Sequence, residues 1–209
     1  MRNRLREFFI ASSQQSRSEM RSSMKIGILA VQGAFAEHEQ MLEQLGAEYI
    51  ELRKGEDVRQ SYDGLILPGG ESTVQGKLMR ELDMFDTIQS QIKNGMPVLA
   101  TCAGVILLAQ QLSNDAATHL ATLPAVVRRN AYGRQLGSFS VDEQIEGIGT
   151  FPMRFIRAPY IEKVLDDTKV LAKVDGNIVM VENKNQLAMS FHPELTSDTR
   201  IHEMFLKKI

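Results

Sequence analysis

Cysteine is almost absent from this chain of 209 residues, which has one cysteine and no tryptophan. A single cysteine excludes an internal disulfide and is typical of a reducing compartment, so we expect a cytoplasmic protein. The cysteine and the four histidines do not show the spacing of a zinc site. We therefore expect no metal and no cofactor.

An excess of charge of one sign is also absent, since 24 Lys and Arg residues nearly balance 26 Asp and Glu residues. The net charge of −2 argues against nucleic acid as a partner. No apolar run is long enough to span a membrane, so we expect no membrane partner. The hydrophobic content of 43% is ordinary for a globular protein, and the length suits one α/β domain with a full core.

Residues 1–23 differ in composition from the rest of the chain. They carry five arginines and two glutamates, a charge of +3. Their apolar segment, Phe8-Phe9-Ile10-Ala11, is too short for the core of a signal peptide, whereas Met24-Lys25-Ile26 is typical of a natural start. We predict a disordered extension over residues 1–23, which we interpret as a start-site artefact rather than a basic targeting segment, and one domain over residues 24–209.

Strand and helix patterns alternate in the first half of the domain. Strands are expected at 26–31, 48–52 and 65–67 and in the segment before Cys102, and helices at 35–45, 74–82 and 84–93. This alternation predicts an α/β fold with a doubly wound, mostly parallel sheet that binds ligands at the carboxyl ends of its strands.

The second half has a different pattern, with several short apolar segments. They lie at 151–157, 170–174, 178–181 and 187–191. Asp175-Gly176 is a hairpin signal, so we expect antiparallel strands that extend the sheet. A helix over residues 201–207, with Asp198 or Thr199 near its start, is expected to close the chain.

The segment from Pro97 to Gly104 predicts a buried strand, a sharp turn at Cys102 and the start of a helix. Pro97 can open a strand, and Gly104 permits a close backbone approach after the turn. A cysteine at such an elbow projects its sulfur toward the first amides of the next helix, which favour a thiolate and can hold an oxyanion. The alternative is a cysteine that only packs in the core, and this segment alone leaves both interpretations open.

A second segment, Ser190-Phe191-His192-Pro193-Glu194, supplies a base and an acid. His192 precedes a proline and is pushed toward extended geometry, in which residues two apart project to the same side. Glu194 can then orient the His192 ring. A nucleophile, a base and an acidic residue that orients the base form the catalytic triad of acyl transfer. We expect His38 to be solvated on the polar side of its helix, and His202 to lie on the terminal helix without a comparable acidic partner.

Two glycine turns follow predicted strands. The turn at Pro68-Gly69-Gly70 has bare amides that can donate to an oxyanion or clamp a polar ligand, and Ser72 or Thr73 is the expected N-cap of the next helix. Gln32-Gly33 is the other turn. For each turn taken alone, an ordinary connection between strand and helix explains the residues at least as well.

Six motifs extend from about Met24 to the C-terminus. They are Ala30-Val31-Gln32-Gly33, Leu67-Pro68-Gly69-Gly70-Glu71-Ser72-Thr73, Thr101-Cys102-Ala103-Gly104, Arg129-Asn130-Ala131-Tyr132-Gly133-Arg134-Gln135, Phe155-Ile156-Arg157-Ala158-Pro159 and Ser190-Phe191-His192-Pro193-Glu194-Leu195-Thr196. With these motifs the chain resembles the triad-type, or class I, glutamine amidotransferases, which have a flavodoxin-like domain. It is most similar to the glutaminase subunits of pyridoxal 5′-phosphate synthases.

The resemblance implies hydrolysis of L-glutamine to L-glutamate and ammonia. Cys102 would be the nucleophile, His192 the acid and base, and Glu194 its orienter. The oxyanion donors would be backbone amides of Gly69, Gly70 and Ala103. The glutamine-binding residues would be Gly70, Glu71, Ser72, Arg129, Ile156 and Arg157.

The sequence departs from the family at three places. The region from Ser113 to Val127 is shorter and less typical of the family. Family members usually carry glycine two residues before the cysteine, where this chain has Ala100. Glu182-Asn183-Lys184-Asn185 replaces a small, glycine-bearing turn, which we interpret as a tolerated change in a hairpin.

A glutaminase without an acceptor domain implies a partner, because free ammonia is lost to water. The resemblance implies a (β/α)₈-barrel synthase subunit that makes pyridoxal 5′-phosphate (vitamin B6), joined with this chain in a large hetero-oligomer. The alternatives are the glutaminase subunit of another amidotransferase, a γ-glutamyl hydrolase, or a non-catalytic regulatory or thiol-sensing module on the same fold.

Overall fold

The computed structural model describes residues 24–129 and 137–209. The extension predicted over residues 1–23 lies outside these residues. The same holds for Asn130-Ala131-Tyr132-Gly133-Arg134-Gln135, the larger part of the arginine motif.

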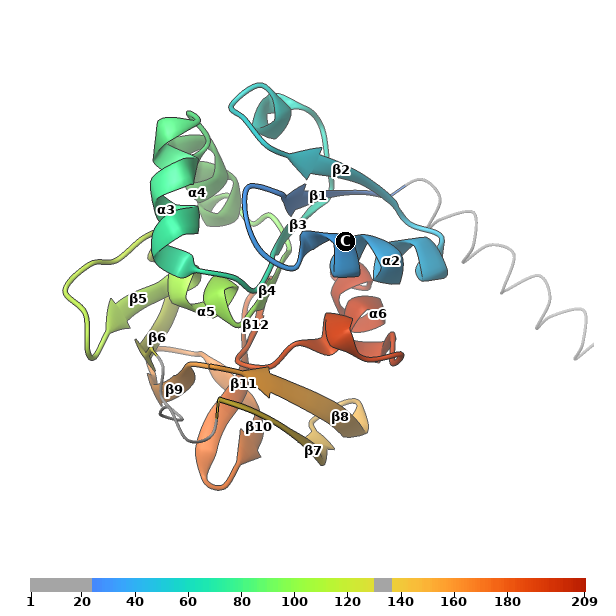
Figure 1. The fold of residues 1–209 in the computed structure, drawn as a ribbon, viewed down its shortest axis with the longest axis vertical. Coiled ribbons are helices and arrows are strands. Elements are labelled where there is room, and N and C mark those ends of the chain that lie inside the picture. The colour runs from blue at the N-terminus through green and yellow to red at the C-terminus, as the bar shows by residue number, and fades with distance from the viewer. Residues whose placement is uncertain (1–23, 130–136) are drawn as a thin grey trace, which may run out of the picture.

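Within the described residues, ten strands form one sheet at the centre of the molecule (Figure 1). Their order is β2-β1-β3-β4-β12-β11-β9-β6-β5, and β10 pairs with β11. From β2 to β12 all neighbours are parallel, whereas β11 and β9 pair antiparallel with each of their neighbours. The bounds are β1 Lys25–Leu29, β2 Glu48–Leu52, β3 Gly64–Leu67, β4 Val98–Thr101, β5 Ala109–Leu112, β6 Leu123–Arg128, β9 Tyr160–Val164, β10 Lys169–Val174, β11 Asn177–Asn183 and β12 Gln186–Met189.

Helices cover both faces of the sheet (Figure 1). On one face lie α3 (Ser72–Glu81), α4 (Phe85–Lys93) and α5 (Ala103–Leu108), which share one hydrophobic core. On the other lie α2 (Phe35–Leu45) and α6 (Arg200–Leu206), with a second core. The inner parallel strands β1, β3, β4 and β12 are buried almost throughout, and β3 and β4 therefore have nearly continuous apolar sequences.

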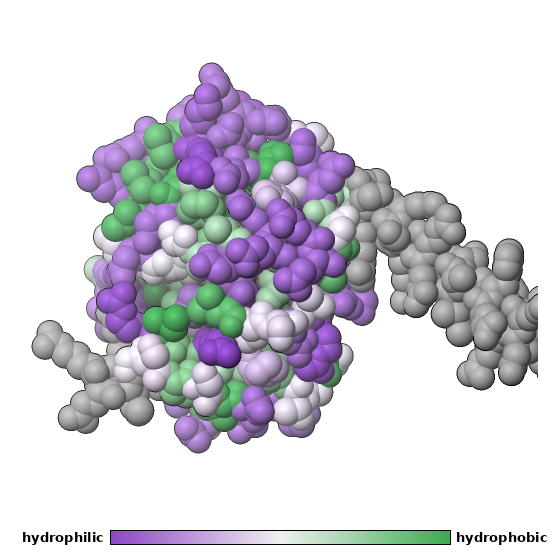
Figure 2. Space-filling model, turned by 45° about the vertical axis from the view of Figure 1, so that its right-hand side comes forward, coloured by the Kyte–Doolittle hydropathy of each residue, from purple (hydrophilic) through white to green (hydrophobic). Residues whose placement is uncertain are grey.

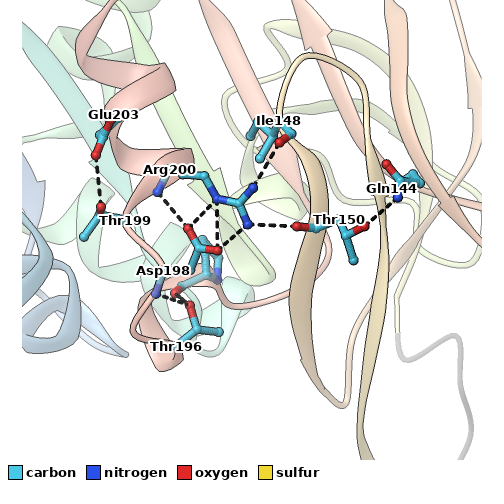
Figure 3. A network of polar contacts seen from close by, with 9 residues as sticks. Gln144, Ile148, Thr150, Thr196, Asp198, Thr199, Arg200 and Glu203 are labelled. Atoms are coloured by element: carbon cyan, nitrogen blue, oxygen red, sulfur yellow. Dashed lines mark hydrogen bonds and ion pairs between the residues drawn. The ribbon is translucent and has the colours of Figure 1, made fainter.

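A two-stranded hairpin lies beside α6. It consists of β7 (Ser138–Ile145) and β8 (Gly149–Ile156), and every second residue of β8 from Phe151 to Phe155 is buried. Arg200, at the start of α6, pairs with Asp198 and donates to the carbonyls of Ile148, at 3.0 Å, and Thr150, at 2.8 Å (Figure 3). These contacts fix the hairpin against the segment that leads from β12 to α6.

The predicted fold class is confirmed: the sheet is doubly wound and mostly parallel, with an antiparallel extension. The hairpin at Asp175-Gly176 is confirmed between β10 and β11, and Lys184 and Asn185 form the turn between β11 and β12. Strands β5, β6, β7 and β9 are not predicted by the sequence. In β7 the side chains alternate between exposed and half-buried, so its apolar signal is weak.

The predicted N-cap of α3 is wrong. Glu71 occupies the cap position in extended geometry without a side-chain bond, and Ser72 is already the first helical residue. The orphan amides of this helix start are therefore not bound by the side chain of the cap residue.

Hydrophilic residues cover much of the face in Figure 2, with smaller apolar areas between them. Among the helices of the described residues, none combines the length and apolar character needed to cross a membrane.

Candidate active site

A cavity of about 390 Å³ opens at the carboxyl ends of the parallel strands. It brings together the segments that follow β1, β3, β4 and β12, together with the end of β8. Its lining is Gln32, Gly33, Ala34, Glu37, Gly69, Gly70, Glu71, Ser72, Cys102, Ile106, Arg129, Ile156, Arg157, Pro159, His192 and Leu195. Parallel sheets place ligand sites at this edge, since all the strand-to-helix turns gather there.

Cys102 occupies a strained elbow between β4 and α5, with φ of 46° and ψ of −101°. Its N–H donates to the carbonyl of Met189 at 2.8 Å, so the parallel neighbour β12 holds the elbow in place. A Cβ on Gly104 would lie 2.2 Å from the carbonyl oxygen of Leu67, so only glycine fits after the turn. This geometry is typical of nucleophile elbows.

His192 lines the same cavity, and its backbone N–H donates to the backbone carbonyl of Arg154 at 2.8 Å. Its Nδ1 is 2.6 Å from Oε1 of Glu194. The backbone route to this contact differs from the extended segment that the sequence predicts. Pro193 starts a 3₁₀ turn over Pro193–Leu195, a position that proline favours, and the turn brings Glu194 back beneath the ring.

The charges around His192 favour its protonated form. Burial lowers the pKa of this imidazole, but hydrogen bonds to Cys102 and Glu194 and the negative charge of both raise it to about 10. An imidazolium beside Cys102 favours the thiolate, which is the reactive form of cysteine.

Backbone amides near Cys102 are the candidate oxyanion donors. The N–H of Gly69 donates to Thr101 Oγ1 at 3.0 Å, and the N–H of Glu71 donates to Gln32 Oε1 at 2.8 Å. Between them, the N–H of Gly70 has no hydrogen-bond partner among the described residues. Ala103 is the first residue of α5, so its N–H is one of the orphan amides of a helix start.

The residues expected to bind glutamine all line the cavity: Gly70, Glu71, Ser72, Arg129, Ile156 and Arg157. Arg129 is held at the rim by Asp115, at 2.5 Å, and by Thr73, at 3.0 Å. Ser72 Oγ is buried without a partner among the described residues. A buried hydroxyl of this kind is rare in native proteins, and a polar ligand in the cavity would satisfy it.

The sequence reasoning assigns no role to two residues that support the site, Gln32 and Thr101. Gln32 supports the glycine turn through the Glu71 amide, although its turn alone gave no reason to prefer a ligand loop. Thr101 lies directly before Cys102 and binds the Gly69 amide. Its position directly before Cys102 is the sequence signal that could have identified Thr101.

The expectation for His38 is wrong. This side chain is fully buried. Its Nδ1 lies 2.9 Å from Nε2 of His202, and its Nε2 lies 3.3 Å from the hydroxyl oxygen of Thr101. It faces inward because α6 packs against α2, a tertiary contact that helical periodicity does not reveal. In the described parts of the chain, no group of three or more His, Cys, Asp or Glu side chains is arranged to hold a metal ion.

The fold and the cysteine elbow at the sheet edge are those of a glutamine amidotransferase. A solved structure described as a glutamine amidotransferase matches with a TM-score of 0.83 and 43% sequence identity, covering 88% of this chain and 97% of that one. More specifically, this chain belongs to the SNO glutamine amidotransferase family, whose profile matches residues 28–209.

Two similar relatives carry the name pyridoxal 5′-phosphate synthase subunit PdxT. The protein from Desulfitobacterium hafniense (strain DSM 10664 / DCB-2) is 63% identical over 186 residues, which cover 89% of this chain and 94% of the relative. The protein from Streptococcus pneumoniae (strain CGSP14) is 52% identical over 187 residues, covering 88% of this chain and 96% of the relative. The family resemblance drawn from the six motifs is thereby confirmed.

Proposed function

We propose that this chain is the glutaminase subunit of a pyridoxal 5′-phosphate synthase. It hydrolyses L-glutamine to L-glutamate and ammonia and supplies the ammonia to a synthase subunit. The observation that carries the proposal is that Cys102 and His192 line one cavity, with Glu194 Oε1 2.6 Å from Nδ1 of His192. The names of the two relatives support the choice of synthase.

Glutamine binds with its side-chain amide toward Cys102. Arg129, Arg157 and Glu71 lie around the cavity, and they offer charges of both signs to the α-carboxylate and α-ammonium groups of an amino acid. The charged side chains select glutamine by its two charged groups, while Cys102 in the same lining faces the amide.

The first half-reaction forms a thioester. The Cys102 thiolate attacks the amide carbon, so a C–S bond forms and the carbonyl electron pair moves to oxygen. His192 then gives its proton to the amide nitrogen, the C–N bond breaks, and ammonia leaves.

The second half-reaction regenerates the enzyme. His192 takes a proton from a water molecule as that water attacks the thioester carbon, and the C–S bond breaks to release glutamate and the thiolate. Glu194 holds the His192 ring in one tautomer through both steps, since its carboxylate accepts from Nδ1 at 2.6 Å.

The amides of Gly70 and Ala103 stabilise the tetrahedral oxyanion in both steps. Of the two predicted glycine donors, Gly69 is occupied by Thr101, which favours Gly70. One such donor contributes about 3 kcal/mol to the transition state. The orientation of the single peptide between Gly69 and Gly70 therefore controls the rate.

The acceptor of ammonia is a separate subunit. The proposed partner is a (β/α)₈-barrel synthase in a large hetero-oligomer, and the proposed compartment is the reducing cytoplasm, consistent with the single cysteine. Docking of the barrel over the cavity would keep ammonia from protonation in bulk water.

The test is glutamate release from L-glutamine, measured for the purified chain alone and after addition of the barrel synthase. We expect release to rise sharply with the synthase. High release that ignores the synthase would indicate another amidotransferase subunit or a γ-glutamyl hydrolase. No release in either case, with binding verified by sedimentation, would indicate a regulatory module.

A further inference from the structure

Behind Glu194, on the side away from His192, lie two more histidines that the proposed mechanism does not use. His38 comes from α2 and His202 from α6, and both are fully buried. Nδ1 of His38 is 2.9 Å from Nε2 of His202, and the two rings are tilted by 53°. A buried polar pair of this kind is expensive unless its hydrogen bonds are satisfied.

The outer nitrogen of His38 faces the acidic member of the triad. Nε2 of His38 lies 3.6 Å from Oε2 of Glu194 and 3.3 Å from the Thr101 hydroxyl. Oε2 has no hydrogen-bond partner among the described residues, whereas Oε1 is occupied by His192. A proton on His38 Nε2 therefore reaches the carboxylate in two ways: it hydrogen-bonds Thr101 Oγ1, which donates to Glu194 Oε1 at 3.5 Å, and its partial positive charge faces the unpaired Oε2.

Both rings are neutral at pH 7. Burial, together with the repulsion between protonated forms of His38 and of its neighbours His202 and His192, holds the pKa of His38 well below its usual value. Burial lowers the pKa of His202 to about 4. Each neutral ring has one N–H donor and one acceptor nitrogen, so the pair has only two consistent arrangements of its protons.

One of these arrangements satisfies the groups better. If His202 donates from Nε2, His38 carries its proton on Nε2 and directs it to Glu194 and Thr101, and the only unpaired ring atom is the acceptor Nδ1 of His202. In the reverse arrangement a lone pair of His38 faces the carboxylate, and a buried N–H of His202 has no partner. An unpaired buried donor is costly, so the first arrangement is preferred.

We propose that His38 and His202 are positioning residues of the triad: the Nε2–H of His38 supports the Glu194 carboxylate from behind, and His202 fixes the tautomer of His38. The inference rests on the proposed triad. It makes α2 and α6 part of one relay that ends at Cys102. The titratable groups facing Glu194 are His192 in front and His38 behind, followed by Cys102 and His202.

The test uses the reactivity of Cys102, which is the single cysteine of the chain. The alkylation rate with iodoacetamide, measured against pH in the full-length chain, reports the thiolate that His192 stabilises. Removing the donor with His38→Leu leaves the Glu194 carboxylate without support on the side away from His192, so the carboxylate holds the His192 imidazolium less firmly. We expect the acid limb of the plot of alkylation rate against pH to move to higher pH by about one unit. On that limb the alkylation rate would then be roughly tenfold lower than in the wild type.

A conservative variant and a packing control separate positioning from stability. His38→Gln keeps an amide donor and should return the profile to within a few-fold of the wild type. Leu42→Ala shortens another buried side chain of α2 and should leave the profile in place despite lower stability. If His38→Leu and Leu42→Ala give the same profile, the inference is overturned.

Two further measurements cover the remaining outcomes. If His38→Leu does not fold, as judged by circular dichroism, the comparison of His202→Leu with His202→Gln decides in its place, since only the amide can donate to His38. Glu194→Gln tests the triad itself. If it leaves the profile unchanged, the proposed triad fails and the inference with it, whereas a shift in Glu194→Gln without one in His38→Leu overturns the inference alone.

Discussion

The two sides of the His192 ring differ sharply in their exposure to solvent. The buried side, which consists of Thr101, Glu194, His38 and His202, is almost inaccessible to water, and its members contact one another. The open side, which consists of Glu71, Arg129, Ile156 and Arg157, lines the cavity with half-buried or exposed side chains.

This difference separates two tasks. A charge held in a dry environment interacts strongly and needs no rearrangement during the reaction, so the buried side can set the protonation state of His192 in advance. Exposed charges such as Arg157 and Glu71, 3.4 Å apart, are screened by water and interact weakly. They can exchange their mutual contact for the charged groups of a substrate.

The largest effect is expected where the two sides meet. Cys102→Ala removes the proposed nucleophile, so glutamate release with the synthase present should fall by about 10⁴-fold or more. Binding to the synthase, measured by sedimentation, should be unchanged, because the thiol is buried. Activity that survives the substitution would contradict the assignment of the nucleophile.

The next largest effect tests the buried side. Glu194→Gln should lower kcat by about 10³-fold, since an amide no longer enforces the correct tautomer of His192. Glu162→Gln, which removes a partly exposed carboxylate at β9, is the control. Comparable kcat values for the two variants would show that the buried side does not act on the reaction.

The protonation states can be compared directly among the histidines. In a titration followed by NMR, His192 should stay protonated until about pH 10, while His202 should stay neutral down to about pH 4. In Cys102→Ala the pKa of His192 should fall, because one of the hydrogen bonds that raise it is lost. A His192 that titrates near 6.5 in the wild-type chain would remove the difference between the two sides.

A smaller effect is expected from added volume beside the ring. The Cβ in Gly69→Ala would lie 2.2 Å from Cε1 of His192, so the ring must move, and a displacement of this kind lowers kcat by about 10²-fold. Gly137→Ala is the matched control, since nothing lies within 4 Å of its added Cβ. Equal kcat values for the two variants would show that the ring has room to adapt.

The smallest effect belongs to the open side. Arg157→Ala should raise KM for glutamine several-fold with little change in kcat, and it should change the free energy of unfolding by less than about 1 kcal/mol. Arg128→Ala breaks another surface ion pair, with Glu162, outside the cavity lining and should leave KM unchanged. A loss of kcat in Arg157→Ala would place this side chain in the chemical step.

The sequence predicts the parallel half of the sheet well, because strands buried on both faces leave continuous apolar runs such as those before Gly69 and Cys102. It predicts the antiparallel half less completely. Strand β7 is mostly exposed, and β9 is short and carries charged residues, so neither has a clear pattern. The hairpin partner β8 stabilises β7, and the more distant strands β6 and β11 stabilise β9. A local apolar pattern does not register such pairing.

The residues of the site likewise divide into those that local motifs identify and those that depend on contacts between distant segments. Turns and short motifs identify Cys102, His192 and the glycine turn, because a strained elbow and a close backbone approach require particular residue types. The buried position of His38 is not encoded in its own helix. It depends on α6, whose His202 lies 164 residues away in the chain.

The sequence by itself determined the class of fold, the family and the residue types of the site, since periodicity, glycine turns and local motifs are short-range properties of the chain. Only the tertiary structure decided which donors are free, which histidines are neutral and which side of His192 is dry. Those properties depend on burial and on contacts between segments far apart in the chain, and these contacts exist only once the two faces of the sheet are covered.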